Sequence, residues 1–343
     1  MSDLPIRVLV VDDSAFARKV VREVLSGEPS IDVVGTARDG LDALEKIAEL
    51  APDVVTLDLV MPNLDGVGLL QALAGTEAPP AVIVVSMADE ESELGAAALE
   101  LGAVDVVTKP TALATDRLYG LGGELRAKVL ALGRRRRPAE TVTRSTPPAG
   151  GAQATTTRAV LIGASTGGPQ ALSQLIRALP KDFPVPIAMV LHMPEGYTDA
   201  YARRLDAAGG LRVLEAHDGL ALEPGVVVVA RAGRHLVFEA EGERWVCKLD
   251  LMPADTPHRP AVDVMFRSGA ARFGAGTLGV VLTGMGNDGL DGSRAIRRAG
   301  GRVLTEAESS CVVYGMPRSV SEAGLSSAVA PLERMADLIL ENL

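Results

Sequence analysis

Short apolar runs alternate with amphipathic stretches through most of this 343-residue chain, and that alternation limits the folds open to it. In the first third the apolar runs are Val8–Val11, Val33–Gly35, Val54–Leu57, Val82–Val85 and Val104–Val107. Helical patterns separate them, such as Ala15–Leu25, Gly40–Leu50 and Gly66–Leu73, with a last one near Leu118–Leu132. Strands that alternate with helices build parallel βαβ units. The pattern predicts a doubly wound domain of flavodoxin-like type.

The alternation stops between Arg134 and Thr157. This segment, RRRRPAETVTRSTPPAGGAQATTT, is rich in Pro, Gly, Thr and Arg and has almost no apolar periodicity. Such a composition is typical of an extended linker. We therefore expect an N-terminal domain over residues 1–133, a flexible linker over 134–157 and a C-terminal domain over 158–343.

Alternating patterns resume after the linker. The expected strands are Ala159–Ile162, Ile187–Leu191, Arg212–Glu215, Val226–Val229, Leu236–Glu239, Trp245–Leu249 and Leu278–Leu282. The expected helices are Pro169–Leu179, Thr198–Ala207, Ala261–Ala271, Asp288–Ala299 and Leu332–Leu340. The consecutive strands between Val226 and Leu249 indicate an antiparallel hairpin excursion on a mostly parallel sheet. The fold class predicted for the whole chain is α/β, with two doubly wound domains.

Charge and hydropathy exclude several classes of protein. A net charge of −10 argues against a general nucleic-acid binder, because phosphate contacts need clustered Lys and Arg. The one basic run, Arg134–Arg137, is interpreted as solvated linker. No apolar run approaches the roughly 18 residues of a membrane span, and no signal peptide is evident, so we expect a cytoplasmic protein without direct membrane insertion. Cys247 and Cys311 lie too far apart in sequence to indicate a disulfide framework or a zinc site.

Charged residues follow several strands of the N-terminal domain. Asp12 and Asp13 follow the first strand, Asp58 ends the third, and Lys109 ends the fifth. The carboxyl ends of parallel strands lie along one edge of a sheet, so these groups should meet there. Three carboxylates together suit Mg²⁺, and a carboxylate beside Mg²⁺ and lysine can attack a phosphoryl group. Ser86 would offer its hydroxyl to the phosphate. Helix capping is the alternative for any one acid taken alone.

The motifs "VDDS", "LDLVMPNLDG", "VSM" and "TKP" make this part resemble the receiver domain of bacterial response regulators. The resemblance implies phosphorylation of Asp58 by a partner histidine kinase. It also implies Mg²⁺ held by Asp12, Asp13, Asp58 and a backbone carbonyl. The family often carries an aromatic residue three positions before the lysine, where this chain has Val106, so signalling by rotation of an aromatic ring is not expected.

A glycine-rich turn with a serine opens the C-terminal domain in "LIGASTGGPQAL". A dinucleotide-binding turn needs glycine where Ser165 stands, and the GK[ST] triplet of a P-loop is missing. The letters Gly163-Ala-Ser165-Thr-Gly167 instead match G-x-S-x-G, which can present a serine hydroxyl on a sharp turn between strand and helix. The unpaired N–H groups at the start of the helix suit an oxyanion. A common helix entry rich in Gly and Ser is the alternative.

Four histidines are candidates for the base of a serine nucleophile. His192 follows an apolar strand and precedes a Pro-Gly loop, the place expected for a base at a sheet edge. His217 also lies at a strand end and is a rival. His235 leads into a strand, and His258 lies in a proline-rich loop. Each one taken alone is more typical of an ordinary surface or core histidine.

The acid candidate is Asp288 in "LTGMGNDGLDG", at the entry of a helix, where an N-cap is its alternative role. Asp291 should lie inside or alongside that helix. The amides of Gly284 and Met285 are candidates to complete an oxyanion hole, since the glycines allow close approach of the backbone.

The motifs "GASTGGPQAL", "HMPEGYT", "AHDG", "HRPAVDVMF", "LTGMGNDG" and "VVYGMP" make residues from about Ala159 onward similar to the catalytic domain of chemotaxis protein-glutamate methylesterases. The resemblance selects Ser165 as nucleophile, His192 as base and Asp288 as orienting acid. From the turns themselves, the backbone N–H groups of Thr166 and Met285 are the expected oxyanion donors. The resemblance also implies removal of methyl esters from receptor glutamates, deamidation of receptor glutamines, and no cofactor in this domain.

Two alternatives to that activity stay open from the residues alone. One is a signalling or binding protein, controlled by the N-terminal domain, whose hydrolase domain is idle. The other is an esterase or acyltransferase for small molecules. The chain also departs from the family at Ala232, where a proline is expected, so substrate preference is less defined than the chemistry.

Overall fold

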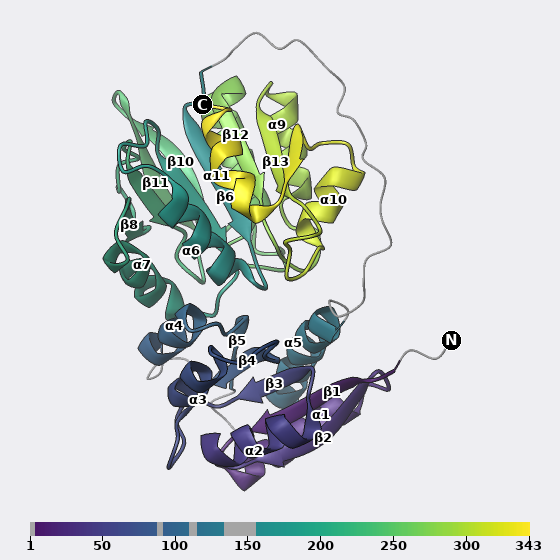
Figure 1. Cartoon of the computed structure of the whole chain (residues 1–343). Coiled ribbons are helices and arrows are strands. Elements are labelled where there is room, and N and C mark those ends of the chain that lie inside the picture. Colours follow the sequence, from purple (N-terminus) through teal and green to yellow (C-terminus); the bar gives the residue numbers. More distant parts are fainter. Residues whose placement is uncertain (1–3, 88–91, 110–114, 134–155) are drawn as a thin grey trace. The chain divides into compact units, whose positions relative to one another are not determined.

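The computed structural model describes residues 4–87, 92–109, 115–133 and 156–343 (Figure 1). The chain divides into two compact units, Met1–Pro138 and Ala139–Leu343. All but Thr156 and Thr157 of the predicted linker, with the basic run Arg134–Arg137, lies outside the described residues. No helix in the described ranges is long and apolar enough to cross a membrane.

The N-terminal unit is a parallel sheet with helices between its strands. The strands are β1 (Ile6–Val11), β2 (Ile31–Ala37), β3 (Val54–Leu57), β4 (Ala81–Ser86) and β5 (Asp105–Thr108). The helices are α1 (Ala15–Ser26), α2 (Gly40–Leu50), α3 (Gly66–Leu73), α4 (Ser92–Glu100) and α5 (Thr115–Gly133). The strand order β2-β1-β3-β4-β5, with every pairing parallel, confirms the flavodoxin-like prediction.

Side-chain caps start the first three helices at the carboxyl edge of this sheet. Ser14 accepts from the backbone N–H of Ala17 ahead of α1, and Asp39 accepts from Asp42 ahead of α2. Asp65 does the same for α3. A cap satisfies N–H groups that the first helical turn leaves unpaired, so each chain segment turns from strand to helix at this edge.

The C-terminal unit is built on a seven-stranded sheet. Its strands are β6 (Ala159–Ala164), β7 (Ile187–Leu191), β8 (Arg212–Glu215), β9 (Val226–Val229), β12 (Thr277–Val281), β13 (Arg302–Glu306) and β14 (Ala328–Ala330). They lie in the order β14-β13-β12-β6-β7-β9-β8, and every pairing is parallel. β10 (His235–Glu241) and β11 (Arg244–Asp250) form a separate antiparallel pair. The expected excursion therefore begins at β10, and the inclusion of Val226–Val229 in it was wrong, because β9 is a parallel strand of the main sheet.

Two apolar cores cover the two faces of this sheet. The helices are α6 (Gly168–Ala178), α7 (Tyr197–Ala207), α8 (Val262–Phe273), α9 (Leu290–Arg298), α10 (Met316–Glu322) and α11 (Leu332–Leu340). α6, α7 and α11 pack on one face, and α8, α9, α10 and the hairpin pack on the other. Successive strand residues face opposite sides, so Ile162 enters the first core and Leu161 the second.

Strand register brings three strand ends together at the carboxyl edge of the large sheet. Gly163 of β6 pairs with Val281 of β12, and Ala164 pairs with Leu191 of β7. The segments that leave β12, β6 and β7 therefore start side by side. These are the segments that carry the predicted acid, nucleophile and base.

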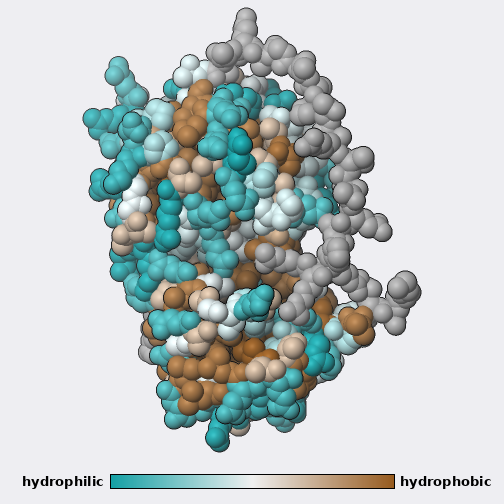
Figure 2. All heavy atoms as spheres, in the orientation of Figure 1, coloured by the Kyte–Doolittle hydropathy of each residue, from teal (hydrophilic) through white to brown (hydrophobic). Residues whose placement is uncertain are grey.

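Figure 2 shows brown, apolar side chains gathered over part of the N-terminal unit, amid teal polar ones. Among the described residues of that unit, the large exposed apolar side chains are Leu4, Phe16, Leu41, Val60, Met87 and Leu94. In the C-terminal unit Leu251 and Met252 are exposed on the loop after β11.

Candidate active site

Ser165 and His192 occupy equivalent places at the ends of neighbouring strands. Ser165 directly follows β6 and His192 directly follows β7. The N–H of His192 donates to the carbonyl of Ala164 at 3.2 Å. Neighbouring strands run about 4.8 Å apart, so this pairing sets the imidazole beside the serine turn.

The turn at Ser165 is held closely by its neighbours. The N–H of Ser165 donates to the carbonyl of Thr283 at 3.0 Å, and the N–H of Gly168 closes the turn on the carbonyl of Ser165 at 2.6 Å. Gly167 has φ of +79°, which favours glycine. A Cβ on Gly284 would lie 2.9 Å from the Cβ of Ser165, so that position admits no side chain without movement. Ser165 is half-buried at the entry of α6.

His192 and Asp288 form a hydrogen-bonded pair. Nε2 of His192 lies 2.8 Å from Oδ2 of Asp288, and the two side chains are 9% and 11% exposed. Nδ1 of His192 is buried and has no hydrogen-bond partner in the described chain. The hydroxyl of Ser165 likewise makes no hydrogen bond to the residues described. The structure thus forms the histidine–aspartate half of the expected chain and leaves open the link from serine to histidine.

Asp288 is not the N-cap of α9, the helix that follows it. That position is Gly289. The carboxylate of Asp288 accepts the N–H groups of Val262 at 2.7 Å and Asp263 at 2.9 Å, which open α8. Burial raises the pKa of the Asp288 carboxyl, but the hydrogen bonds from His192 and these amides outweigh it, and the pKa lies below its usual range. Asp288 is therefore an anion fixed against the imidazole.

Asp263, in the first turn of α8, accepts hydrogen bonds from the start of α9. Its Oδ1 accepts the N–H groups of Gly289 at 3.0 Å and Gly292 at 2.7 Å. Burial raises the pKa of Asp263, and the nearby charge of Asp288 adds to that effect. The sequence analysis assigned Asp263 no role, although it lies in the quoted motif "HRPAVDVMF". The available signal was that α9 begins after Gly289, which has no side chain to cap the helix, so a distant acceptor had to be present.

The other histidines take three different places. His217 is exposed and its Nδ1 lies 3.0 Å from the carbonyl of Asp218, so the rival base is not in this cluster. His235 is buried, and its Nδ1 accepts the N–H of Ala261. His258 stacks on His192 with ring centroids 4.0 Å apart, which the sequence did not predict.

The candidate oxyanion donors differ in their availability. The N–H of Met285 has no partner among the described residues. The N–H of Gly284 donates to the carbonyl of Val313 at 3.0 Å, so the expectation that Gly284 supplies a free amide was wrong. Thr166 is buried, and its carbonyl accepts the hydroxyl of Thr283 at 3.0 Å.

The acidic residues of the N-terminal unit also meet as expected. Asp12, Asp13 and Asp58 offer ligand oxygens within 4.8 Å of one another. Nζ of Lys109 lies 2.8 Å from Asp12 and 2.9 Å from Asp58. Burial lowers the pKa of Lys109, but both carboxylates outweigh it, and the pKa lies above its usual range. Three hard oxygen donors beside one cation fit Mg²⁺. Ser86 is buried at the end of β4, beside these groups, since its carbonyl accepts the N–H of Lys109.

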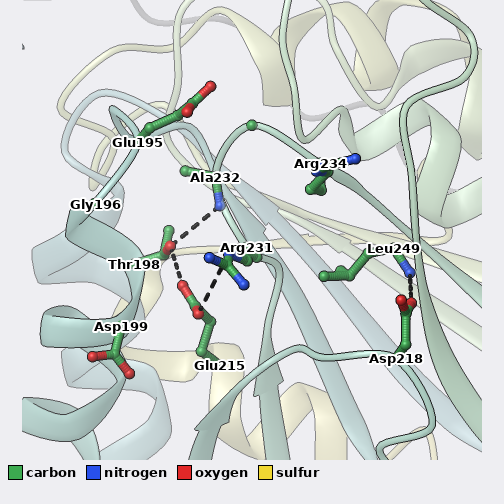
Figure 3. Close-up of a pocket in the computed structure, with 11 residues that line it drawn as sticks. Glu195, Gly196, Thr198, Asp199, Glu215, Asp218, Arg231, Ala232, Arg234 and Leu249 are labelled. Carbon is green, nitrogen blue, oxygen red and sulfur yellow. Dashed lines mark hydrogen bonds and ion pairs between the residues drawn. The ribbon is translucent and has the colours of Figure 1, made fainter.

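A polar pocket of about 500 Å³ lies along the same edge of the large sheet (Figure 3). In it Thr198 donates to Glu215 at 2.6 Å and accepts the N–H of Ala232 at 3.2 Å. The proline expected at position 232 could not make that bond. Gly233 ties the pocket to the loop of His258, because its N–H donates to the carbonyl of Arg259. The lining residues are Glu195, Gly196, Thr198, Asp199, Glu215, Asp218, Arg231, Ala232, Gly233, Arg234 and Leu249.

One sheet thus carries an acidic cluster with a lysine, and the other carries a serine turn beside a histidine–aspartate pair. This combination defines a hydrolase unit joined to a signal-receiver unit. A model of the CheB methylesterase family matches residues 160–339, and a model of the response regulator receiver domain matches residues 8–118. The chain belongs to the CheB methylesterase family.

Relatives match nearly the whole chain. A protein-glutamate methylesterase/protein-glutamine glutaminase of Myxococcus xanthus is 60% identical over 98% of this chain and 97% of its own. One of Symbiobacterium thermophilum is 45% identical over 98% of this chain and 96% of its own. The crystal structure of the Thermotoga maritima CheB methylesterase catalytic domain is 40% identical, with a TM-score of 0.53, and covers 55% of this chain and all of its own.

Proposed function

We propose that this protein hydrolyses methyl esters of glutamate side chains in chemotaxis receptors and deamidates receptor glutamines through the same intermediate. The names of relatives that match nearly the full chain support this substrate class. The observation that carries the chemistry is the pairing of His192 Nε2 with Asp288, which leaves a buried, unpaired Nδ1 beside the serine turn.

Ser165 is the nucleophile of this reaction. Nδ1 of His192 takes the hydroxyl proton as Oγ attacks the ester carbonyl, and Asp288 stabilises the imidazolium that forms. His192 then returns the proton to the departing methoxide, so methanol leaves and an acyl-enzyme remains. Water attacks the acyl-enzyme by the same proton path and releases glutamate. A glutamine side chain enters the same sequence and loses ammonia.

Backbone amides of Met285 and Thr166 stabilise the oxyanion of the tetrahedral intermediates. Thr166 lies at the entry of α6, where the N–H groups of the first turn carry positive potential. Both residues lie close to Ser165. Thr166 directly follows it in the chain, and Met285 directly follows Gly284, whose backbone approaches the Cβ of Ser165.

In the receiver domain, residues 1–133, Asp58 is the phosphorylation site for a histidine kinase. Asp12, Asp13 and Asp58 would hold Mg²⁺, which would neutralise charge on the phosphoryl oxygens. Lys109 and Ser86 bind the phosphoryl group. Residues 134–157 tether this domain to the methylesterase domain, residues 158–343, and the unphosphorylated receiver restrains esterase activity.

Replacement of Ser165 by alanine tests the nucleophile. Ser165→Ala should abolish methanol release from methylated receptor while phosphate incorporation at Asp58 stays intact. Ser173→Ala is the matched control, because the hydroxyl of Ser173 bonds to the carbonyl of Pro169 and to the hydroxyl of Tyr201 and to no group assigned to the reaction. Methanol release at the wild-type rate from Ser165→Ala would refute the assignment.

A further inference from the structure

A fully buried carboxyl lies beneath the serine turn, and the reaction above does not use it. Glu306 ends β13 and its side chain is 0% exposed. No lysine, arginine or histidine of the described chain forms an ion pair with it. A buried carboxyl without a cationic partner is costly, so it needs hydrogen bonds to persist.

Hydrogen-bond donors surround Glu306 on both oxygens. The N–H of Thr283 donates to Oε2 at 2.7 Å, and the hydroxyl of Ser310 donates to Oε1 at 2.9 Å. The thiol of Cys311 adds a third hydrogen bond. Burial outweighs these bonds and raises the pKa of Glu306. Hydrogen bonding to neutral donors, rather than pairing with a cation, is what holds this side chain.

The contact with Thr283 continues the sheet beyond its last strand pair. The register between β12 and β13 runs to Val281 and Thr305. Two residues beyond Val281, the side chain of Glu306 supplies the acceptor that a neighbouring strand would otherwise provide. The backbone at Thr283 is thereby fixed where the ladder has ended.

Thr283 in turn holds both sides of the nucleophile. Its carbonyl accepts the N–H of Ser165 at 3.0 Å. Its hydroxyl donates to the carbonyl of Thr166 at 3.0 Å. Thr283 is therefore bonded to the peptide group that precedes Ser165 and to the one that follows Thr166.

We propose that Glu306 is a positioning residue, which acts through Thr283 to fix the backbone that enters Ser165 and leaves Thr166, and that it does so as a hydrogen-bond acceptor rather than as a charge. The proposal rests on the proposed role of Ser165 as nucleophile. An error of about 1 Å in the position of a reacting group can cost about a hundredfold in rate. Glu306, which two hydrogen bonds link to Ser165 through Thr283, can therefore control the reaction without touching substrate.

Two substitutions at Glu306 in the full-length protein separate the acceptor from the charge. Glu306→Leu leaves the Thr283 N–H unpaired, and kcat for methanol release should fall about a hundredfold while KM stays within about twofold. The rate at which a fluorophosphonate probe labels Ser165 should fall in parallel. Glu306→Gln keeps an oxygen for Thr283, so kcat and the labelling rate should return to within about threefold of wild type.

Thr277→Val is the matched control for lost stability. The hydroxyl of Thr277 is buried at the other end of β12, where it bonds to Gly269 and Gly274. Its loss should lower the thermal midpoint and leave kcat and labelling unchanged. If Glu306→Leu does not fold, Thr283→Val tests the next step of the link. It removes the hydroxyl that bonds to the carbonyl of Thr166 and accepts the N–H of Val313, and it keeps the backbone bonds to Glu306 and Ser165. That variant should show lower kcat, unchanged KM and slower labelling.

Three results would overturn the proposal. Folded Glu306→Leu or Thr283→Val that labels at the wild-type rate shows that the link does not position Ser165. Glu306→Gln that is as slow as Glu306→Leu shows that charge, not acceptance, matters. Wild-type protein that the probe does not label at Ser165 rejects the proposed nucleophile itself, which distinguishes failure of the function from failure of this inference.

Discussion

Asp288 performs two tasks with one carboxylate. It orients His192 and it caps α8 through Val262 and Asp263. The N–H groups that donate to this carboxylate belong to the rigid start of α8 rather than to a flexible side chain. The carboxylate therefore cannot rotate away from the imidazole without breaking these hydrogen bonds. In the proposed reaction, activity and local stability are therefore coupled at this residue.

Asp288→Asn should lower kcat by about 10³ to 10⁴, because an amide can hold the wrong histidine tautomer. It should also lower the free energy of unfolding by about 2 kcal/mol at neutral pH, since hydrogen bonds to a charged acceptor are lost. The pKa of Asp288 is depressed in the fold, so its stabilisation is present above the ordinary aspartate value and is lost as pH falls through the lower folded value. Urea unfolding at several pH values should show the gap to wild type closing below about pH 4.

Ala232, which stands where the family pattern has proline, makes a hydrogen bond that proline could not make. Its N–H holds the buried hydroxyl of Thr198. Ala232→Pro should lower the free energy of unfolding by about 1 kcal/mol. In a Thr198→Val background there is no such bond to lose, so a double-mutant cycle should give a coupling of similar size. A coupling near zero would mean that the bond contributes nothing.

At the scale of elements, α8 and α9 start by capping each other. Neither helix has a side-chain cap from its own N-cap residue, Ala261 or Gly289. Asp288 supplies acceptors to α8, and Asp263 supplies them to α9. This exchange fixes the angle between the two helices at the point where Asp288 meets His192.

Asp263 and Asp288 should respond to pH with opposite sign. The pKa of Asp263 is raised by burial, so its ionisation weakens the fold as pH rises from the ordinary value through the folded one. Asp263→Asn keeps the one oxygen that accepts both amides and removes a charge that repels Asp288. It should match or exceed wild-type stability at pH 7, by up to about 1 kcal/mol, and lose that advantage in acid. Asp263→Ala should cost about 1 to 3 kcal/mol in the same unfolding assay. Equal destabilisation by both changes would contradict this account.

Most strands and helices could be predicted because their residues have a clear period. β3, β7, β8, β9, α2, α3 and α11 have the predicted bounds. β13, β14 and α10 were not predicted. Three residues of β14 are too few to show a period, and α10 has seven with a proline at its start. β13 ends in Thr305 and Glu306, whose burial depends on partners that the sequence does not reveal.

The predicted members of the site came together for a similar reason. Residues that directly follow parallel strands share one edge, which brought Ser165 to His192 and Asp58 to Lys109. Contacts made by loops could not be predicted in this way. The stacking of His258 on His192 depends on the path of the segment after β11, which has no period to read.

At the scale of the whole molecule, two parallel sheets with different chemistry at their carboxyl edges are joined in one chain. Each has its own buried core, the acidic cluster with Lys109 lies within the first unit, and the His192–Asp288 pair lies within the second. Because the residues proposed for ester hydrolysis all lie in the second unit, we expect Asp58 to control the esterase through access to its site or through the geometry of that unit.

Phosphorylation of Asp58 should raise methanol release from methylated receptor several-fold in the full-length protein, measured with a small-molecule phosphodonor and Mg²⁺. Asp58→Asn should keep the basal rate and lose the response. Asp32→Asn is the matched control, since Asp32 is exposed near the amino end of β2, and it should respond like wild type.

Residues 156–343 alone should release methanol faster than the unphosphorylated full chain, because the restraint is gone, and should ignore the phosphodonor. A receiver that only restrains must give this increase. A lower rate for residues 156–343, with unfolding as cooperative as in the full chain, would show instead that the receiver contributes to substrate binding. In that case the loss in kcat/KM should appear as a higher KM at constant kcat, because residues 156–343 retain all the groups proposed for ester hydrolysis.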